Sequence, residues 1–282
     1  MDKSRIAQIL LTIPPCMWAL LQLTERIPLG FTVPTPILEL VTFLGIASMG
    51  LLIIVRVFDS LTQIEPEALC YLAPNTPIID GAWTSPTEWV GAQEYVMRYG
   101  DACFRAMHDL NFIYFMIDVL REETVHKDSW CWIYLDGRCD RSRSPNEDDI
   151  AFSLQWETTN TPVKIIQRGN GTHWGQETRE LPEGFAVSSS LRMAQIESLN
   201  HPHLTYEFKI PKSVVGLSTK MGLRIALHDA SRFDPKQHKD RYIIVWPRMR
   251  ETESSRDVPK SWGVLRLLHQ YKGIALGLDK AE

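Results

Sequence analysis

Three aromatic residues at alternate positions, Trp130, Trp132 and Tyr134, are the first feature of this sequence that could do chemistry. Alternate residues of a β-strand point to the same face, so these rings would form one stripe. An aromatic face can stack on the apolar C–H surface of a sugar ring while neighbouring polar groups bind its hydroxyl groups. The stripe therefore predicts a ligand platform, unless another segment covers it, and we add His126 and Trp174 as candidate ligand-binding residues.

Acidic residues bracket the polar loop that follows this stretch, with Asp136 before it and Asp148 and Asp149 after it. Calcium ions take oxygen ligands, many of them carboxylates, at about 2.3–2.6 Å. The three side chains are therefore candidate ligands of Ca²⁺, the one cofactor that we predict. The alternative is that they are solvated turn residues that pair with nearby arginines of the loop.

The elements that must position these residues are short β-strands. The runs 111–119, 130–136 and 150–154 follow one another with turn residues between them, which predicts an antiparallel meander. Further segments with a strand pattern stand at 102–107, 163–167, 204–210, 222–229, 242–246 and 262–268. Because about ten short strands occur without a convincing helical period, we predict an all-β fold, an antiparallel β-sandwich of the jelly-roll type.

Two of these strands differ in the burial that their sequences predict. The run 111–119 is almost entirely apolar and aromatic, which predicts a strand buried on both faces. The segment 204–210 alternates instead, with Leu204, Tyr206 and Phe208 on one face, which predicts a half-buried strand.

The first sixty residues differ from the rest. Ile6–Leu23 and Ile37–Val55 are nearly all apolar, and a helix needs about 20 residues to cross a membrane, so the second run qualifies and the first is marginal. We predict a helical hairpin in the membrane. The alternatives are a single anchor behind a re-entrant or interfacial segment, a cleaved signal peptide, and two helices that pack on the soluble domain.

These patterns divide the chain into four regions. We expect a membrane anchor at 1–58, a linker at 59–76, the β-sandwich at 77–268 and a tail at 269–282. The net charge of −4 argues against a nucleic-acid partner, because nucleic-acid binders are usually basic. No nucleophile elbow, phosphate loop, zinc-protease helix or dinucleotide fingerprint occurs, so no enzyme class is indicated.

The five cysteines lack the spacing of a metal site, and their odd number gives no disulfide framework. Cys131 and Cys139 could form a bridge across the polar loop, with two independent thiols as the alternative that we favour.

An ordered series of segments resembles the family 9 carbohydrate-binding modules and the wider DOMON-like sandwich superfamily. The series consists of Pro77-Ile78-Ile79-Asp80-Gly81 followed by Trp89, Asn111-Phe112-Ile113-Tyr114, Trp132-Ile133-Tyr134-Leu135-Asp136, Glu147-Asp148-Asp149-Ile150-Ala151-Phe152, Tyr206-Glu207-Phe208-Lys209-Ile210-Pro211, Gly222-Leu223-Arg224-Ile225-Ala226-Leu227-His228-Asp229 and Pro259-Lys260-Ser261-Trp262-Gly263-Val264-Leu265. The resemblance spans about 190 residues and leaves out the first 75.

The resemblance implies a non-catalytic, extracytoplasmic domain that binds sugar between two tryptophans and carries structural calcium. The chain departs from the family at both tryptophan positions, where His126-Lys127-Asp128 and Ser255-Arg256-Asp257 stand. The charges that flank the two apolar runs disagree with an extracytoplasmic location. Lys3, Arg5 and Arg56 outnumber Arg26 in the link between the runs, which favours a cytoplasmic domain by a small margin.

Taken together, these features predict a membrane-anchored binding module for carbohydrate or a related ligand. A first alternative is a structural or protein-interaction sandwich that has lost sugar binding. A second is a haem-binding electron carrier, as some DOMON-like domains are, with axial ligands drawn from His108, Met193 and Met221.

Overall fold

In the computed structural model, the described residues are 66–192, 202–230, 243–247 and 256–272, and they belong to one compact unit that begins at Glu65. The predicted membrane anchor at 1–58 lies outside these residues, as does most of the predicted tail. Within the described ranges, no helix is both long enough and apolar enough to cross a membrane.

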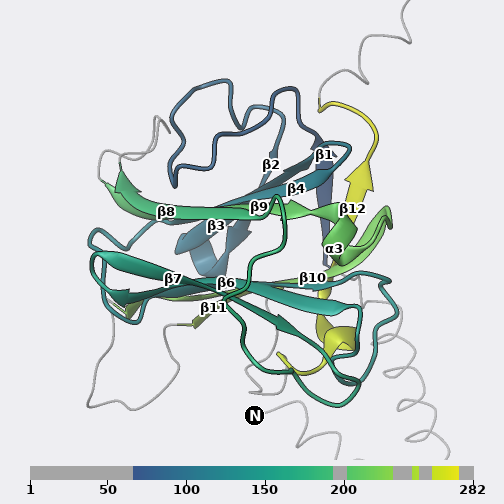
Figure 1. The fold of residues 1–282 in the computed structure, drawn as a ribbon. Helices are drawn as coiled ribbons and strands as arrows, with labels where there is room; N and C mark the ends of the chain where they lie inside the picture. Colours follow the sequence, from purple (N-terminus) through teal and green to yellow (C-terminus); the bar gives the residue numbers. More distant parts are fainter. Residues whose placement is uncertain (1–65, 193–201, 231–242, 248–255, 273–282) are drawn as a thin grey trace, which may run out of the picture. The chain divides into compact units, whose positions relative to one another are not determined.

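The described part of the chain forms two β-sheet layers that face each other (Figure 1). The first layer contains β5 (Trp130–Asp136), β6 (Asp149–Thr158), β7 (Thr161–Arg168), β10 (Lys220–His228) and β11 (Ile243–Trp246). The second contains β2 (Gln93–Met97), β3 (Ala102–His108), β4 (Phe112–Val119), β8 (Ala186–Arg192) and β9 (His203–Pro211). The predicted all-β class and the sandwich-like arrangement of the strands are therefore confirmed.

Two more strands close one edge of the sandwich, β1 (Glu67–Leu72) and β12 (Gly263–Leu268). They join the layers into one hydrogen-bonded path with the order β7-β6-β5-β10-β12-β1-β3-β4-β9-β8, to which β11 and β2 are added at β10 and β3. Short helical turns, η1 (Arg98–Gly100), α3 (Lys212–Val215) and η4 (Pro259–Ser261), occupy connections.

The closing edge corrects two expectations. The sheet is not purely antiparallel, because β1 pairs in parallel with both β12 and β3. The strand β1 also lies in the segment 59–76 that we expected to be a linker. Its sequence, EALCYL, is too short and too mixed to stand out, and it becomes a strand because it fills the gap between the two layers.

The predicted meander of three neighbouring strands was wrong in its first member. The strands β5 and β6 pair antiparallel, with Trp130 opposite Gln155. The strand β4 instead pairs with β3 and β9 in the other layer, so the link 120–129 crosses the sandwich. Strand patterns give positions along the chain, and they carry no information on which layer a strand joins.

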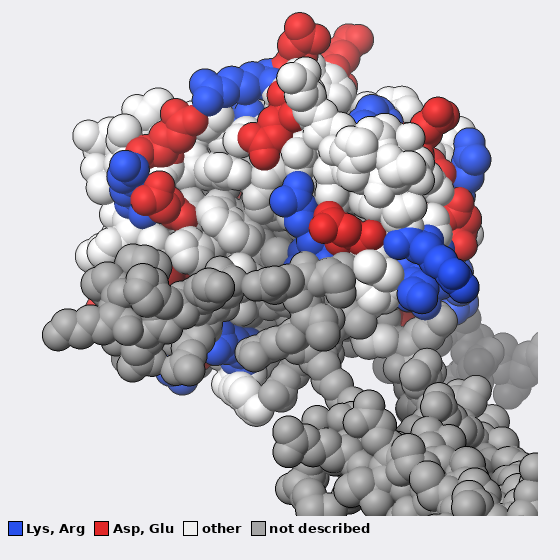
Figure 2. All heavy atoms as spheres, turned by 90° about the horizontal axis from the view of Figure 1, so that it is seen from below, with Lys and Arg blue, Asp and Glu red and all other residues white. Residues whose placement is uncertain are grey.

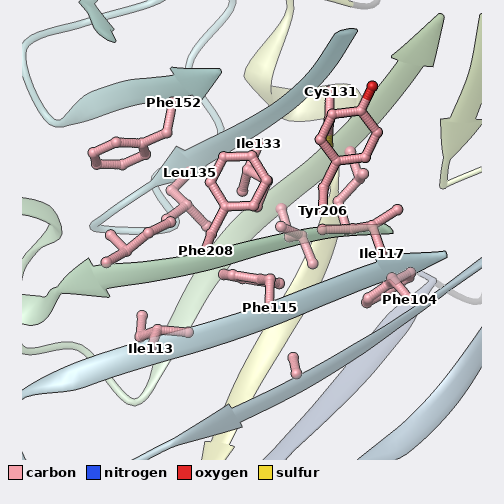
Figure 3. Close-up of a cluster of buried hydrophobic side chains, with 14 of the residues drawn as sticks. Phe104, Ile113, Phe115, Ile117, Cys131, Ile133, Leu135, Phe152, Tyr206 and Phe208 are labelled. Atoms are coloured by element: carbon pink, nitrogen blue, oxygen red, sulfur yellow. The ribbon is translucent and has the colours of Figure 1, made fainter. Parts of the chain in front are cut away.

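The core lies between the layers and is formed by the alternate residues of each strand (Figure 3). Residues of β4 and β9 face residues of β5 and β6 across it, and the largest include Phe115, Phe152, Tyr206 and Phe208. The predicted inner face of the segment 204–210 is thus confirmed. The prediction that this strand is half-buried was wrong, because Thr205 and Glu207 on its other face are buried as well.

A second apolar cluster covers the outer face of the second layer. Trp89 and the chain around it pack on Met107, Tyr114 and Met116 of β3 and β4. This explains why β4 is apolar on both faces, as its sequence predicts. Glu207 is buried under the same segment, and its carboxylate accepts hydrogen bonds from the Trp89 indole and from two backbone N–H groups.

Candidate functional site

The aromatic stripe lies on the outer face of β5, in a small apolar cluster of its own. Trp132 and Tyr134 stack with their ring centres 5.7 Å apart and their planes 19° apart. Only 6% of Trp132 and 2% of Tyr134 is exposed. These two rings therefore offer almost no surface to a ligand.

Two further tryptophans cover the end of the stripe. Trp174 and Trp262 are nearly parallel, with 6.2 Å between ring centres, and both contact the Tyr134 ring. Trp174 reaches this position because the loop after β7 folds back, so that Gly169 and Trp174 pair in an isolated antiparallel bridge. Trp174 thus packs on the stripe and is itself buried.

Two arginines lie on the same rings. The guanidinium carbon of Arg224 is 5.0 Å from the centre of the Tyr134 ring, and that of Arg256 is 5.8 Å from the Trp132 ring. Arg256 also donates a 2.6 Å hydrogen bond to the Gln167 side chain. A cation over an aromatic ring is held by the ring's quadrupole, so the arginines stabilise the closed face.

Trp130 is the ring of the stripe that keeps an open side. It is only half-buried, and it stacks on His228 of β10 with 5.5 Å between ring centres and 24° between planes. A pocket with a volume of about 280 Å³ opens beside this ring pair. Its lining consists of Asp128, Trp130, Gln155, Trp156, Glu157 and His228.

The backbone holds this pocket firmly. Asp128 donates its N–H to the Trp156 carbonyl at 2.7 Å, and Trp156 donates its own to the Ser129 carbonyl at 2.9 Å. These bonds continue the β5–β6 ladder to the pocket edge, where Asp128 takes a left-handed conformation with φ of 70°. Aspartate adopts this conformation more readily than most residues, which suits it to the corner.

The pocket is rich in hydrogen-bond acceptors. The Nδ1 atom of His228 lies 2.9 Å from the Asp128 carbonyl, which can only accept, so Nδ1 carries the proton and Nε2 of the neutral ring is an acceptor. Asp128 and Glu157 add two exposed carboxylates, and Gln155 adds an amide. Glu157 also pairs with Arg179 at 2.8 Å, an exposed ion pair that solvent screens.

His126 lies apart from these lining residues. Its Nε2 atom is 2.6 Å from the Thr124 hydroxyl, within the loop that precedes β5. The structure therefore brings Trp130 to the pocket, buries Trp132, Tyr134 and Trp174 beneath other side chains, and leaves His126 in a neighbouring loop.

Sequence reasoning missed the residues that β6 and β10 contribute to the pocket. Gln155 and Glu157 lie at the end of β6, and His228 at the end of β10, more than seventy residues further on. The polar residues on either side of Trp156, Gln155 and Glu157, indicate that the strand leaves the core at this end and that the two polar side chains share its outer face. Only the register of β5 with both neighbours brings these residues together.

A buried acid lies in the link that leads to this pocket. Glu122 is fully buried, and one of its carboxylate oxygens accepts a 2.5 Å hydrogen bond from the Ser129 hydroxyl, while the other has no partner among the described residues. Burial raises the pKa of Glu122 to about 8, and the negative charge of Asp229 adds to this rise. At neutral pH this side chain is therefore largely protonated.

The three candidate calcium ligands gather around the loop between β5 and β6. Both oxygens of Asp136 accept backbone N–H groups, from Asp140 at 3.3 Å and Arg141 at 3.1 Å. Asp148 accepts the Arg138 N–H at 3.0 Å. These two carboxylates thus organise the loop backbone.

Asp149 differs from the other two because one of its oxygens is free. Its Oδ2 accepts the Asn146 N–H at 2.7 Å, whereas its buried Oδ1 has no hydrogen-bond partner in the part of the chain that the structure describes. Burial raises the pKa of Asp149 to about 7, and the charges of Asp136, Asp148 and Asp140 contribute. A bound cation would relieve this accumulation of negative charge.

The geometry of the loop gives a metal only limited support. Carboxylate oxygens are the donors that calcium prefers, and the free Oδ1 of Asp149 is one such donor. Among the described residues, however, no three histidine, cysteine or acidic side chains are grouped so that they could hold a metal ion. The site does not fit as it stands, and calcium at Asp136, Asp148 and Asp149 stays a prediction.

Neither of the two candidate haem ligands that the structure describes, His108 and Met221, has a side chain open to an axial position. Both ring nitrogens of the buried His108 lie 3.1 Å from backbone carbonyls, and Lys212 also approaches its Nδ1 at 3.0 Å. Met221 lies inside the main core, and Met193 lies outside the described residues.

The four described cysteines, at positions 70, 103, 131 and 139, are free thiols, and burial raises the pKa of each. The prediction that Cys131 and Cys139 are two independent thiols is therefore confirmed.

Comparisons with known proteins find solved structures that have a similar fold. No protein-family model and no curated protein matches the sequence. A family 9 carbohydrate-binding module from Caldicellulosiruptor kristjanssonii in complex with cellotriose is similar in structure, with a TM-score of 0.51 and 16% identity over 74% of this chain and 96% of that one. The same organism's family 9 module with glucose gives 0.49 and 16% over 73% and 98%. The chain therefore has a fold like that of the family 9 modules.

Proposed function

We propose that this protein is a non-catalytic carbohydrate-binding module whose ligand platform is the Trp130–His228 ring pair. The observation that carries the proposal is the pocket beside Trp130, where a partly exposed aromatic ring meets acceptors at fixed positions. An aromatic ring binds the apolar face of a pyranose, and the surrounding polar groups bind its hydroxyl groups. The fold shared with a cellotriose-binding module supports this class of ligand.

The platform differs from a two-tryptophan clamp. Arg256 belongs to the segment where the second clamp tryptophan would stand, and it lies over Trp132 instead of leaving a slot for a sugar. Asp128 belongs to the segment of the first clamp tryptophan, and it forms an edge of the pocket. In our proposal, the chain therefore uses one ring pair and a polar rim, and not two facing tryptophans.

Four further predictions accompany the proposal. The first 58 residues anchor the protein in a membrane, and the sandwich lies outside the cytoplasm. A DOMON-like relationship and structural calcium at the loop of Asp136, Asp148 and Asp149 remain open to test. None of these is needed for sugar to bind beside Trp130.

The test is a glycan array followed by calorimetry on the full chain. Because the first 58 residues are predicted to be membrane segments, the protein is purified in a detergent that has no sugar head group. We expect saturable binding of an oligosaccharide that Trp130→Ala abolishes and that Trp83→Ala retains, because Trp83 lies in the apolar cluster on the other layer. Unchanged affinity in Trp130→Ala would reject the platform.

A second candidate is a structural or protein-interaction sandwich. The closure of the stripe by Trp174, Trp262, Arg224 and Arg256 favours it, because the part of the face that these side chains cover offers almost no surface to a ligand. A folded full chain that binds no glycan on the array would support this reading over the first.

A further inference from the structure

Resting on the proposed function, we infer that the pocket beside Trp130 selects a sugar that carries a protonated amine, such as a glucosamine unit, over a neutral hexose. The charged residues that line the pocket are both acidic, Asp128 and Glu157. A cationic ligand is therefore attracted, and an acidic sugar is repelled.

The acceptor groups of the pocket match an ammonium group. Because Nδ1 of His228 is committed to the Asp128 carbonyl, its Nε2 offers a lone pair. Together with the two carboxylates and the Gln155 amide oxygen, the pocket supplies acceptors on several sides. An ammonium group has three donors and no acceptor, so it satisfies such a pocket better than a hydroxyl group does.

The aromatic residues add to the same preference. Trp130 lines the pocket with a half-buried ring, and the face of a tryptophan ring attracts cations more strongly than the other aromatic rings do. The Trp130–His228 pair leaves a flat surface for the sugar ring itself. The pocket volume of about 280 Å³ suits a single sugar unit and not a long stretch of chain.

The cation of a neighbouring ion pair opposes this attraction. Arg179 pairs with Glu157, but both side chains are more than half exposed, at 69% and 52%, so solvent screens the pair. An ammonium group in the pocket can therefore compete for the Glu157 carboxylate, while Asp128 forms no ion pair within the described residues.

The experiment compares three β-1,4-linked hexamers by calorimetry on the full chain at pH 7, namely the glucosamine hexamer, its N-acetylated form and cellohexaose. We expect the glucosamine hexamer to bind about ten-fold tighter than the other two, and this preference to fall in high salt. Asp128→Asn and Glu157→Gln should each reduce the preference at least about three-fold. Glu177→Gln is the matched control, because it removes an exposed carboxylate outside the pocket.

Each other outcome has its own meaning. Equal binding of all three hexamers that is lost in Trp130→Ala would overturn the amine preference and keep the carbohydrate module. Binding of the glucosamine hexamer that persists in Trp130→Ala would show unspecific charge attraction and overturn the inference. A folded chain that binds none of the hexamers would overturn the inference and, if the glycan array is also blank, the proposed function with it.

Discussion

The guanidinium of Arg256 lies 5.8 Å from the centre of the Trp132 ring while it donates a 2.6 Å hydrogen bond to Gln167. Arg256 is thereby fixed between β5 and β7 and covers the middle of the aromatic stripe. This relationship decides which part of the stripe can meet a ligand. It leaves Trp130 as the accessible ring and makes Trp132 part of the protein's interior.

Removing this cover should cost stability without removing the platform. We expect Arg256→Ala to lower the free energy of unfolding by about 1–3 kcal/mol, because a cation–ring contact and a charged hydrogen bond are both lost. Denaturant unfolding measures the change, and Gln167→Ala in the same background tests whether the two losses overlap. An affinity for sugar that falls more than about three-fold in Arg256→Ala would mean that the site extends to Trp132.

The two tryptophans of the stripe should separate binding from stability. Trp132→Ala removes a buried ring that stacks on Tyr134, so we expect a loss of about 3–5 kcal/mol in the free energy of unfolding. Trp130→Ala removes a half-buried ring and should cost clearly less while it abolishes sugar binding. The reverse order of the two stability losses would contradict the burial described for these residues.

Stability should fall as the pH rises from about 5 to 8 because of Glu122. The pKa of this buried acid is about 8 in the folded chain, against an ordinary value of 4.5, so the folded state holds a proton that the unfolded state releases. The contribution is present below the unfolded pKa and is lost as the pH rises through the folded value. We expect Glu122→Gln to flatten the dependence of the melting temperature on pH across this window.

The comparison of these two proteins at two pH values provides the control. At pH 5 both side chains are neutral in the fold, and the melting temperatures should be similar. At pH 8.5 the Gln variant should be the more stable protein. Parallel pH profiles for the two would show that Glu122 does not titrate in this range.

The carboxylate of Glu207 should hold the segment around Trp89 on the second layer. It accepts the N–H groups of Asp80 at 3.0 Å and Gly81 at 2.8 Å, and the Trp89 indole at 3.1 Å. Glu207→Ala leaves these donors without their acceptor, and we expect a loss of about 3 kcal/mol or more. Glu207→Gln keeps one acceptor oxygen and should lose less, whereas the exposed Glu183→Ala should have little effect.

Calcium, if it binds at the loop between β5 and β6, should stabilise the fold through Asp149. We expect the melting temperature of the full chain to rise with added Ca²⁺ and to fall with a chelator, as binding to the folded state alone requires. Asp149→Asn should remove this response, because Oδ1 of Asp149 is the unpartnered oxygen of the loop. A melting temperature that changes neither with added Ca²⁺ nor with a chelator would contradict the prediction of structural calcium.

The sequence by itself determined where most strands lie and which of their residues face the core. Alternation placed Leu204, Tyr206 and Phe208 on the inner face, because a strand exposes successive side chains to opposite sides. The run 111–119, which contains β4, is apolar at consecutive positions, and this indicated that both faces of the strand are buried. The resemblance to the family 9 modules also anticipated the fold from segments spread over the whole sandwich.

Only the tertiary structure decided which face of β5 is open and what surrounds it. The stripe could serve as a platform or as an interior surface, and the choice depends on Trp174, Trp262, Arg224 and Arg256, which lie far away in sequence. Short-range patterns report the face of a strand, whereas covering and pocket formation depend on contacts between distant segments. The pocket beside Trp130 arises in this way, because β6 and β10 flank β5 in a register that no local pattern specifies.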